Sequence, residues 1–395
     1  MHPLRYLSLI FVFLFSCNSG NRSQPEGDTG EKAVSISFEK LDSVKIDYLG
    51  NPTVHDIDPQ SGTILFMEHR QSSEDIMVAD FEGEILASFS KLGDVPDGYG
   101  KLMSTLRIEN DESFLVYGYN GFMTYDFTGE LQSKEKLKTF RVPNFTRKSM
   151  GFGMEKWEGN YLYIDQGSSH IDYYSLEAYN EMRLLNWLDP KTGAKEPFIQ
   201  FPENSIFKSG KYFFRDSWAP AFTLADDKIY VVFGIEPVIY VFETSPPYSL
   251  LSSIPVELED YRYFNGSIDK SVDGILRFTS GSILNIKKIA GYFVIAYFPG
   301  YSDADKEAEN ENKTHQENLL FRERMLKKYT KRIAVVDTLG KTIGDFVPEG
   351  LVANSMLVRN GELWMQEMPD EEVEQDFFWL FRVELRVNEL KNNED

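Results

Sequence analysis

The sequence predicts an all-β chain, and its most economical architecture is a β-propeller of six four-stranded blades. Three observations predict it. Short aromatic and β-branched runs alternate with Gly, Asp and Asn turns over most of the 395 residues, and long helical periods are few. A pair of such strands recurs six times along the chain. In three of these copies the pair runs into the same Asp-x-x-Gly turn.

Each repeated unit has a polar turn, an apolar strand, a gap and a second strand. The first strands of the six units are 61–66, 111–116, 158–163, 226–231, 290–294 and 360–365. The strands that follow them are 76–80, 122–126, 170–174, 238–242, 332–337 and 378–383. The apolar segments of the first strands start 47 to 71 residues apart, which leaves room for four strands and variable loops in each unit.

Such units are expected to close into a ring, because a closed ring leaves only short and protected sheet edges. The alternative is a seven-bladed ring, with a further blade in the long interval between Tyr163 and Ile229. In the C-terminal unit the strands run out after about residue 385 or 390. Either 34–38 or 44–48 could supply its outer strand, which would latch the ring by joining both ends of the chain.

The Asp-x-x-Gly turns lie at 80–84, 126–130 and 337–341, each directly after a second strand. The aspartate can accept hydrogen bonds from the turn backbone, and the glycine can take the positive φ that a chain reversal needs. We therefore expect a hairpin at each of these positions.

One sizeable insertion, 301–331, interrupts the fifth blade between its second and third strands. It begins acidic and Asn-rich and then becomes helical in pattern. The apolar residues that fall mainly on one helical face are Leu319, Leu320, Met325, Leu326 and Tyr329. Its position predicts that it projects over the face where ligands bind. Two interpretations stay open: a lid or partner-docking helix, and a helix packed on the edge of its own blade.

The N-terminal residues predict export. Residues 6–15 are apolar and follow Arg5, and a run of about ten residues is roughly half of what a membrane-spanning helix needs. The one cysteine, Cys17, ends this run after Leu14 and Ser16, and this arrangement resembles the bacterial lipoprotein signal. The resemblance implies removal of a signal peptide, 1–16, and lipid attachment at Cys17. A polar tether would then occupy 17–33, and a single propeller domain 34–395.

An ordinary signal peptide with an incidental cysteine is the alternative to the lipoprotein signal. With lipid on Cys17, the membrane is an expected partner. The expected location is the bacterial cell envelope, on the periplasmic side or at the cell surface.

The chain also resembles the six-bladed β-propeller lipoproteins of Bacteroidetes-type bacteria, many of which carry a Gly-Pro-Gly-Glu-Tyr-like turn after their first complete blade. Gly93, Pro96, Gly98 and Tyr99 match that turn loosely, whereas Asp94 and Val95 depart from it. The resemblance spans nearly the whole chain and implies a fold and a cellular location. It implies no biochemical role, since most members of that group have none established.

Composition and motifs exclude several function classes. A formal net charge of −21, from 62 acidic and 41 basic residues, repels phosphate backbones, so nucleic acid is not an expected partner. The few histidines do not stand at metal-ligand spacing, so we expect neither a metal nor a cofactor. The carboxylates around Asp56–Gly62 and Asn265–Gly274 fit Asx turns better than a calcium site. No nucleophile elbow, phosphate loop or dinucleotide fingerprint occurs, and catalytic residues stay unknown.

The geometry of a propeller gives the remaining candidates. Loops between the second and third strands share one face with the connections between blades, and ligands commonly bind there. Several side chains expected on that face could bind a sugar or peptide by stacking and hydrogen bonding. They are His69, Tyr119, Asn120, His170, Arg215, Trp218 and Tyr263.

The leading functional hypothesis is therefore a binding or interaction module, whose partner is a glycan, peptide or envelope protein. A carbohydrate-active hydrolase or lyase using carboxylates at the channel mouth is the alternative. A scaffold within an envelope complex is a third possibility.

Overall fold

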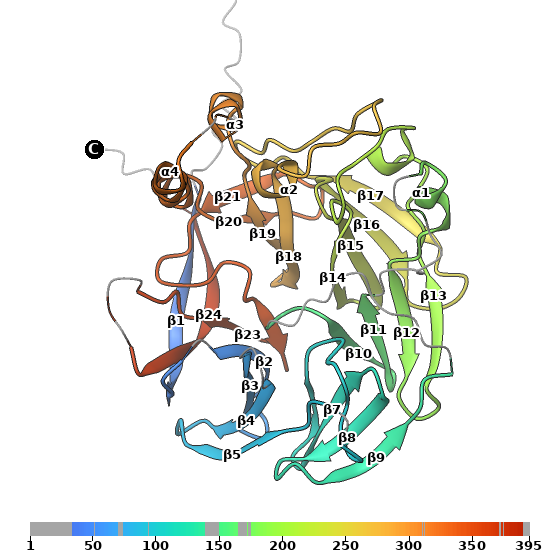
Figure 1. The fold of residues 1–395 in the computed structure, drawn as a ribbon, viewed down its shortest axis with the longest axis vertical. Coiled ribbons are helices and arrows are strands. Elements are labelled where there is room, and N and C mark those ends of the chain that lie inside the picture. The colour runs from blue at the N-terminus through green and yellow to red at the C-terminus, as the bar shows by residue number, and fades with distance from the viewer. Residues whose placement is uncertain are drawn as a thin grey trace, which may run out of the picture.

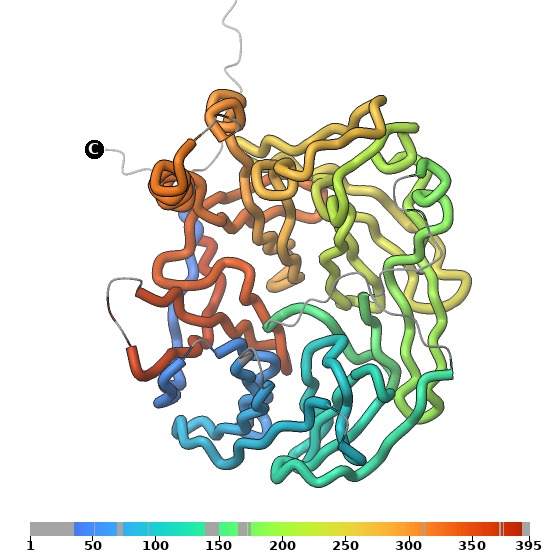
Figure 2. The backbone as a smooth tube through the Cα atoms, in the orientation of Figure 1, coloured from blue at the N-terminus to red at the C-terminus, as the bar shows by residue number. Residues whose placement is uncertain are grey.

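The computed structural model consists of six four-stranded antiparallel sheets arranged as the blades of a ring, which confirms the predicted propeller (Figure 1). It describes residues 34–50, 52–69, 74–93, 95–138, 150–164, 172, 175–309, 311, 313–370, 373 and 375–389. Figure 2 shows the chain passing once around the ring, from the first blade to the sixth.

In blades one to five the four strands follow one another along the chain, from the innermost strand outward, whereas blade six takes its outermost strand, β1, from the N-terminal part of the chain. Blades one to three are β2 (Pro52–Asp58), β3 (Thr63–His69), β4 (Glu74–Asp80) and β5 (Ile85–Ser90); β6 (Arg107–Asn110), β7 (Ser113–Gly118), β8 (Gly121–Asp126) and β9 (Leu131–Glu135); and β10 (Met154–Trp157), β11 (Asn160–Ile164), β12 (Leu185–Asp189) and β13 (Ala194–Phe198). Blades four to six are β14 (Pro220–Ala225), β15 (Lys228–Phe233), β16 (Val238–Glu243) and β17 (Leu250–Pro255); β18 (Ser282–Ile289), β19 (Tyr292–Phe298), β20 (Arg332–Val336) and β21 (Thr342–Phe346); and β22 (Leu357–Arg359), β23 (Glu362–Gln366), β24 (Phe377–Glu389) and β1 (Val34–Asp47).

The core lies between the blades. Each middle strand is covered on both faces by neighbouring blades, so it reads as a continuous apolar run; Ile64 to Met67 of β3, for example, are fully buried. Six hydrophobic clusters result, one between each pair of adjacent blades. The outermost strands face water on one side, and β5 alternates between exposed and half-buried residues.

The ring closes through β1, which supplies the fourth strand of blade six. It pairs antiparallel with β24 from Val34 opposite Glu389 to Asp47 opposite Phe377. The predicted latch is therefore confirmed. The two candidate segments, 34–38 and 44–48, turn out to be parts of one long strand with a register shift near its middle.

The three Asp-x-x-Gly turns form the predicted hairpins. In each, one carboxylate oxygen of Asp80, Asp126 or Asp337 accepts a hydrogen bond from the backbone N–H four residues later, at 2.9 Å. Gly83 has a φ of 87°, and a Cβ at that position would lie 1.8 Å from the carbonyl oxygen of Lys45 in the neighbouring blade. Glycine is thus required both for the reversal and for blade packing.

In blade three the prediction of a strand at 170–174 is wrong. The strand that pairs with β11 is β12, Leu185–Asp189, and residue 172 lies outside any strand. The rest of that segment lies outside the described residues. The interval between Tyr163 and Ile229 forms β12, β13 and β14 together with two short helices, α1 (Ala178–Glu181) and η1 (Ile206–Lys208). These strands complete blade three and begin blade four, so the interval holds no further blade within its described part.

The insertion lies between β19 and β20, as predicted, and forms two helices, α3 (Asp303–Glu309) and α4 (His315–Lys328). The second agrees with the predicted helical pattern, whereas the first, in the acidic part, was not predicted. Figure 1 shows both at the rim of the ring, away from its central opening, so they do not cover the channel. The predicted apolar face is partly wrong. Phe321 and Met325 are the buried residues of α4, whereas the three leucines, Leu319, Leu320 and Leu326, are 48%, 59% and 69% exposed.

Asp305 joins the two helices of the insertion. Its carboxylate accepts hydrogen bonds from Lys328 at 2.6 Å and from the Tyr329 hydroxyl, and these contacts lower its pKa to about 2. Among the described residues, no helix combines the length and apolar character that crossing a bilayer requires.

Candidate functional site

Alternation of strand direction gives the propeller two different ends. The loops between the second and third strands and the connections between blades lie at one end, which we call the channel face. The hairpins between first and second strands and the Asp-x-x-Gly turns lie at the other, which we call the hairpin face. α1 and α2 (Leu276–Thr279), which belong to such loops and connections, lie on the channel face, and Figure 1 looks onto it.

Charged side chains from five of the six innermost strands meet in the centre of the ring. They form what we call the channel network: Asp56 on β2, Arg107 on β6, Glu155 on β10, Lys287 on β18 and Arg359 on β22. Sequence reasoning missed four of the five and assigned Asp56 to an Asx turn, whereas Asp56 lies on β2. The available signal was their place on the strand that precedes each repeated strand pair, where one face must line the channel.

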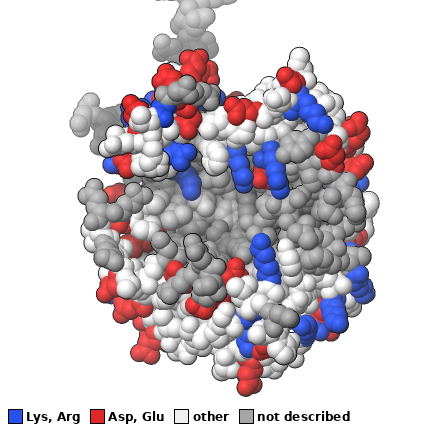
Figure 3. Space-filling model, in the orientation of Figure 1, with Lys and Arg blue, Asp and Glu red and all other residues white. Residues whose placement is uncertain are grey.

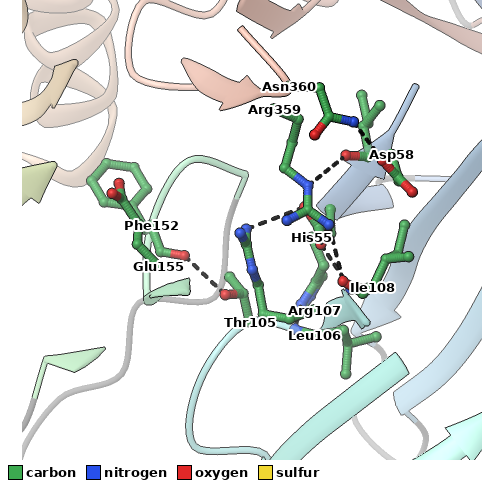
Figure 4. A network of polar contacts seen from close by, with 12 residues as sticks. His55, Asp58, Thr105, Leu106, Arg107, Ile108, Phe152, Glu155, Arg359 and Asn360 are labelled. Atoms are coloured by element: carbon green, nitrogen blue, oxygen red, sulfur yellow. Dashed lines mark hydrogen bonds and ion pairs between the residues drawn. The ribbon is translucent and has the colours of Figure 1, made fainter. Parts of the chain in front are cut away.

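Asp56 is the most buried member of the network, with no exposed surface. Its carboxylate accepts hydrogen bonds from the Ile108 backbone N–H at 2.8 Å and from Arg107 at 3.2 Å, and the Arg359 guanidinium lies 3.4 Å away. Figure 4 shows the two arginines converging, with Arg359 also donating to the carbonyl oxygen of Ile108. Arg359 makes a further hydrogen bond to the carbonyl oxygen of Ile57. Burial, followed by the like charge of Arg107, lowers the pKa of Arg359.

Glu155 makes the second centre of the network. It accepts hydrogen bonds from Lys287 Nζ at 2.7 Å and from the Leu224 backbone N–H at 2.7 Å, and so connects blades three, four and five. Nearer the hairpin face, Asn360 donates to Asp58 at 3.1 Å and Lys156 pairs with Glu109 at 2.9 Å.

The charges of the channel are therefore matched, four carboxylates against four cations. Each carboxylate is held by donors from another strand, which suits a structural tie between blades. An acid–base pair for hydrolysis or elimination would need carboxylates that converge on an open site. Within the described residues, no group of three or more His, Cys, Asp or Glu side chains is placed to hold a metal ion.

A pocket of about 230 Å³ opens between blades four and five, where their innermost strands begin. We call it the mouth pocket. It is lined by Phe214, Asp216, Ser217, Ala219, Gly234, Ile235, Arg277, Ser282, Ile283 and Leu284. Three segments far apart in sequence meet here: the connection before β14, the β15–β16 loop, and the junction of α2 with β18.

A glycine permits this meeting. Gly234 has a φ of 52°, and a Cβ at that position would lie 1.8 Å from the carbonyl oxygen of Ser217. The loop can therefore approach closely enough for the Ile235 N–H to donate to that oxygen at 2.9 Å. A side chain at residue 234 would push the wall of the pocket outward.

The polar groups of the mouth pocket are few and distinctive. Arg277 contacts the Asp216 carboxylate at 3.1 Å, and the Nε atom of Arg215 lies 3.8 Å from the same group. Ser217 is 1% exposed, and its hydroxyl has no hydrogen-bond partner within the described part of the chain. Buried polar groups are normally paired, so this hydroxyl is a candidate partner for a polar group of a ligand that enters the pocket.

The walls around these groups are apolar, since Phe214, Ile235 and Ile283 are all nearly buried. Figure 3 shows several Lys and Arg side chains around the middle of the channel face, and most acidic side chains toward its outer margin. A small apolar cavity with a few convergent polar groups, beside basic side chains, is a typical ligand site.

A larger groove of about 510 Å³ lies between blades three and four, where Phe198 and Tyr248 pack at a centroid distance of 4.5 Å. It is formed largely by prolines and aromatic residues beside the outer strands β13 and β17, away from the channel. No residue lining it has a buried polar atom without a partner among the described residues. The mouth pocket is therefore the stronger candidate.

Three of the predicted ligand residues lie near the mouth pocket. Arg215 borders it, as described. Tyr263 is half-buried and stacks on Tyr261 with ring centroids 5.5 Å apart. Trp218 directly follows Ser217, but it is 3% exposed and packs into the core against Tyr179, so its indole does not reach the channel face.

The other predicted residues belong to other blades. Tyr119 is half-buried, and Asn120 donates to the carbonyl oxygen of Gly98 at 2.8 Å, which holds the Gly-rich turn at 93–100. Tyr99 of that turn is fully buried between blades one and two. His69 ends β3, and its side chain, like His170 and Cys17, lies outside the described part of the structure. The seven predicted residues thus do not form a single site.

No protein-family model matches the sequence, and no curated protein matches it either. Solved structures resemble it to different degrees. A member of the DUF4221 family from Bacteroides vulgatus gives a TM-score of 0.61 over 90% of this chain and 99% of its own, at 12% identity. A Bacteroides fragilis protein named as exported gives 0.48 over 90% and 96%, at 10% identity. A gluconolactonase from Xanthomonas campestris gives 0.41 over 89% and 96%, at 8% identity. The first of these likenesses supports the fold that the resemblance to Bacteroidetes-type propellers implies.

Proposed function

We propose that this protein is an envelope-anchored binding module that holds a small ligand, or the terminal group of a glycan or peptide, in the mouth pocket. The buried hydroxyl of Ser217, which has no hydrogen-bond partner among the described residues, is the observation that carries this proposal. The apolar walls would exclude water from the ligand, and the charged rim would orient it. The enzymatic alternative has less support, because the carboxylates of the channel network are engaged by donors from neighbouring strands.

The topology supports this arrangement for an anchored protein. β1 runs antiparallel to β24, which leaves the channel face, so Val34 lies toward the hairpin face. A tether from a lipid on Cys17 would therefore join the propeller at the end opposite the mouth pocket. The pocket would face away from the membrane and stay open to ligands or to an envelope partner.

We expect Ser217→Ala to separate binding from stability. A buried hydroxyl without a partner costs the folded state about 1 to 3 kcal/mol. Its removal should therefore leave the melting temperature of the unliganded protein unchanged or raise it. Ligand affinity should fall roughly 2- to 12-fold, the equivalent of one hydrogen bond. A thermal-shift screen of sugars, sugar acids, amino acids and short peptides identifies ligands, and calorimetry on both proteins measures the loss.

Ser104→Ala is the matched control. Ser104 is also 1% exposed with an unpartnered hydroxyl among the described residues, but it precedes β6 in blade two. Its replacement should leave affinity unchanged. If the affinity for a ligand falls equally in both variants, or falls in neither of them, the mouth pocket is not the site of that ligand.

The anchor has its own test. Cys17→Ser should release the protein from the membrane fraction into the soluble fraction, because the lipid attachment point is gone. Cell fractionation followed by immunoblotting measures this, and Ser16→Ala, which keeps a small residue before the cysteine, is the control. Unchanged membrane association of the Cys17→Ser protein would contradict lipid anchoring.

A further inference from the structure

We propose that the mouth pocket binds one unit of a neutral sugar, whose hydroxyl groups pair with Asp216, Ser217 and Arg277. This inference rests on the proposed function and adds the chemical class of the ligand. It starts from the hydrogen-bonding groups that line the pocket. They include an acceptor, several donors and hydroxyls that can act as either, and the described part of the protein leaves them partly unused.

Asp216 supplies the acceptor. Its Oδ2 atom contacts Arg277 Nη2 at 3.1 Å, whereas its Oδ1 atom lies 3.8 Å from Arg215 Nε, which is beyond hydrogen-bond range. Oδ1 accepts no hydrogen bond from the residues that the structure describes. The side chain is 14% exposed and lines the pocket, so a ligand hydroxyl that enters can donate to Oδ1.

Arg277 supplies the donors. A guanidinium carries several N–H groups in one plane, and within the described part of the chain the one side-chain contact of Arg277 is with Asp216. Its side chain is 57% exposed at the rim, so the remaining N–H groups are accessible to a ligand. Asp216 and Arg277 therefore place an acceptor and donors side by side.

Two serines add hydroxyl groups deeper in the pocket. Ser217 is 1% exposed, and Ser282, the first residue of β18, is half-buried. Both line the pocket, and neither hydroxyl has a hydrogen-bond partner among the described residues. Because a hydroxyl both donates and accepts, these serines match a ligand that carries hydroxyls of its own.

This set of groups favours a sugar over other small molecules. Sugar hydroxyls lie around the whole ring, so one molecule can pair with Asp216 and Arg277 at the rim and with Ser217 at the buried end. A carboxylic acid would be repelled by Asp216, and an amine would be repelled by Arg277. A free amino acid would match the two charged groups, but an apolar side chain would leave Ser217 and Ser282 unpaired.

The walls and the size of the pocket fit one sugar ring. Phe214, Ile235 and Ile283 provide apolar surface, and the C–H groups of a sugar can pack against the electron-rich face of an aromatic ring. Pockets for drug-sized ligands measure about 300 to 1,000 Å³. At about 230 Å³ the mouth pocket accommodates a single sugar unit, and the rest of a glycan would extend into solvent.

The backbone of Asp216 is consistent with a role in binding. Its φ is 69°, a left-handed value that few residues other than glycine adopt. The turn is held by backbone hydrogen bonds, from Ser217 N–H to Phe214 at 3.2 Å and from Ala219 N–H to Asp216 at 3.0 Å. The carboxylate is therefore not needed to close the turn. Strained conformations of this kind are concentrated at functional sites.

Calorimetry on the intact protein tests the inference by comparing neutral sugars with charged probes of similar size. The sugars are galactose, glucose, mannose, fucose, rhamnose and N-acetylglucosamine, and the charged probes are leucine, N-acetyl-leucine and leucinamide. At least one sugar should bind about tenfold or more tightly than every charged probe, because only a sugar pairs with both ends of the pocket. A charged probe that binds as tightly as the best sugar would overturn the inference.

Variants of the lining residues assign the contacts. Asp216→Asn and Arg277→Gln should each weaken binding of the best sugar about tenfold or more, since each removes a charge-assisted hydrogen bond. Asparagine also adopts left-handed backbone conformations, so the fold should be kept, and a thermal melt checks this. Ser282→Ala should weaken binding roughly 2- to 12-fold.

The matched controls are Asp260→Asn and Arg262→Gln, which alter another exposed ion pair of the channel face, with a contact of 2.9 Å. Neither should change the affinity for the sugar. If Asp216→Asn and Arg277→Gln bind the sugar no more weakly than these controls, the inference is overturned.

The inference and the proposed function can fail separately. If leucine, N-acetyl-leucine or leucinamide binds in a Ser217-dependent way and no sugar binds more tightly, the inference is overturned and the binding module stands. If no probe binds in a Ser217-dependent way, both are overturned.

Discussion

Replacing Asp56 with alanine is expected to lower the free energy of unfolding by about 3 to 5 kcal/mol. The substitution leaves the side chains of Arg107 and Arg359 in the channel, 7% and 18% exposed, without the carboxylate that neutralises them. It also removes the acceptor for the Ile108 N–H. Urea denaturation followed by tryptophan fluorescence measures the change.

Asp42→Ala is the control for this substitution. Asp42 lies on the exposed part of β1, and its carboxylate accepts a hydrogen bond from the adjacent Ser43 N–H. Its loss should cost less than about 0.5 kcal/mol, as for most surface substitutions. If Asp56→Ala cost no more than Asp42→Ala, the channel network would not tie the blades together.

Deleting 34–47 should have a still larger effect, because it opens the ring. The edge of β24 loses its partner strand, and the cluster between blades six and one loses Val44 and Ile46, which are 4% and 0% exposed. We expect no cooperative thermal transition and a strong tendency to aggregate, since an uncovered strand edge pairs with other chains. Circular dichroism melts and size-exclusion chromatography measure both effects.

Two controls refine this result. A chain that starts at residue 34 should melt like the longer protein, because β1 is complete. Ile46→Asp should destabilise the fold by several kcal/mol, as expected for a charge placed in a packed core, whereas Leu41→Asp, at a position 42% exposed, should have little effect. A deletion variant that melts within a few degrees of the control would contradict closure by β1.

The ring was predictable because its signals are local and repeat. The Asp-x-x-Gly turns at Asp80, Asp126 and Asp337 each form a hairpin through contacts between residues that are at most five positions apart. The six strand pairs also follow the same order along the chain. The error in blade three has the same origin. The polar and apolar residues of 170–174 alternate as in a strand. Nothing in the local sequence distinguishes this segment from β12, which is the strand that pairs with β11.

The helical insertion shows a related limit of sequence reasoning. Periodicity shows that α4 has apolar residues, but it cannot show which side of the helix is covered. The structure covers Phe321 and Met325 and leaves Leu319 and Leu326 exposed at the rim. That outcome depends on how the insertion folds back on its own start, where Tyr301 stacks on Tyr329.

The candidate site was only partly within reach of sequence reasoning. Arg215 and Trp218 flank the pocket residues Asp216 and Ser217, but the Trp218 indole packs into the core against Tyr179. The pocket itself depends on the meeting of residues 216–217, 234–235 and 277–284, and on a hydroxyl that has no partner in the described part of the chain. The channel network is equally remote in sequence, since Arg359 bonds to the carbonyl oxygen of Ile57. No local pattern encodes such contacts.

The central claim is that the mouth pocket is the ligand site, and a crystal structure with the tightest-binding compound from the thermal-shift screen tests it most directly. We predict the ligand against Phe214, with one of its polar groups bonded to the Ser217 hydroxyl. A ligand seated instead at Asp56 in the channel, or against Tyr248 in the outer groove, would contradict the account.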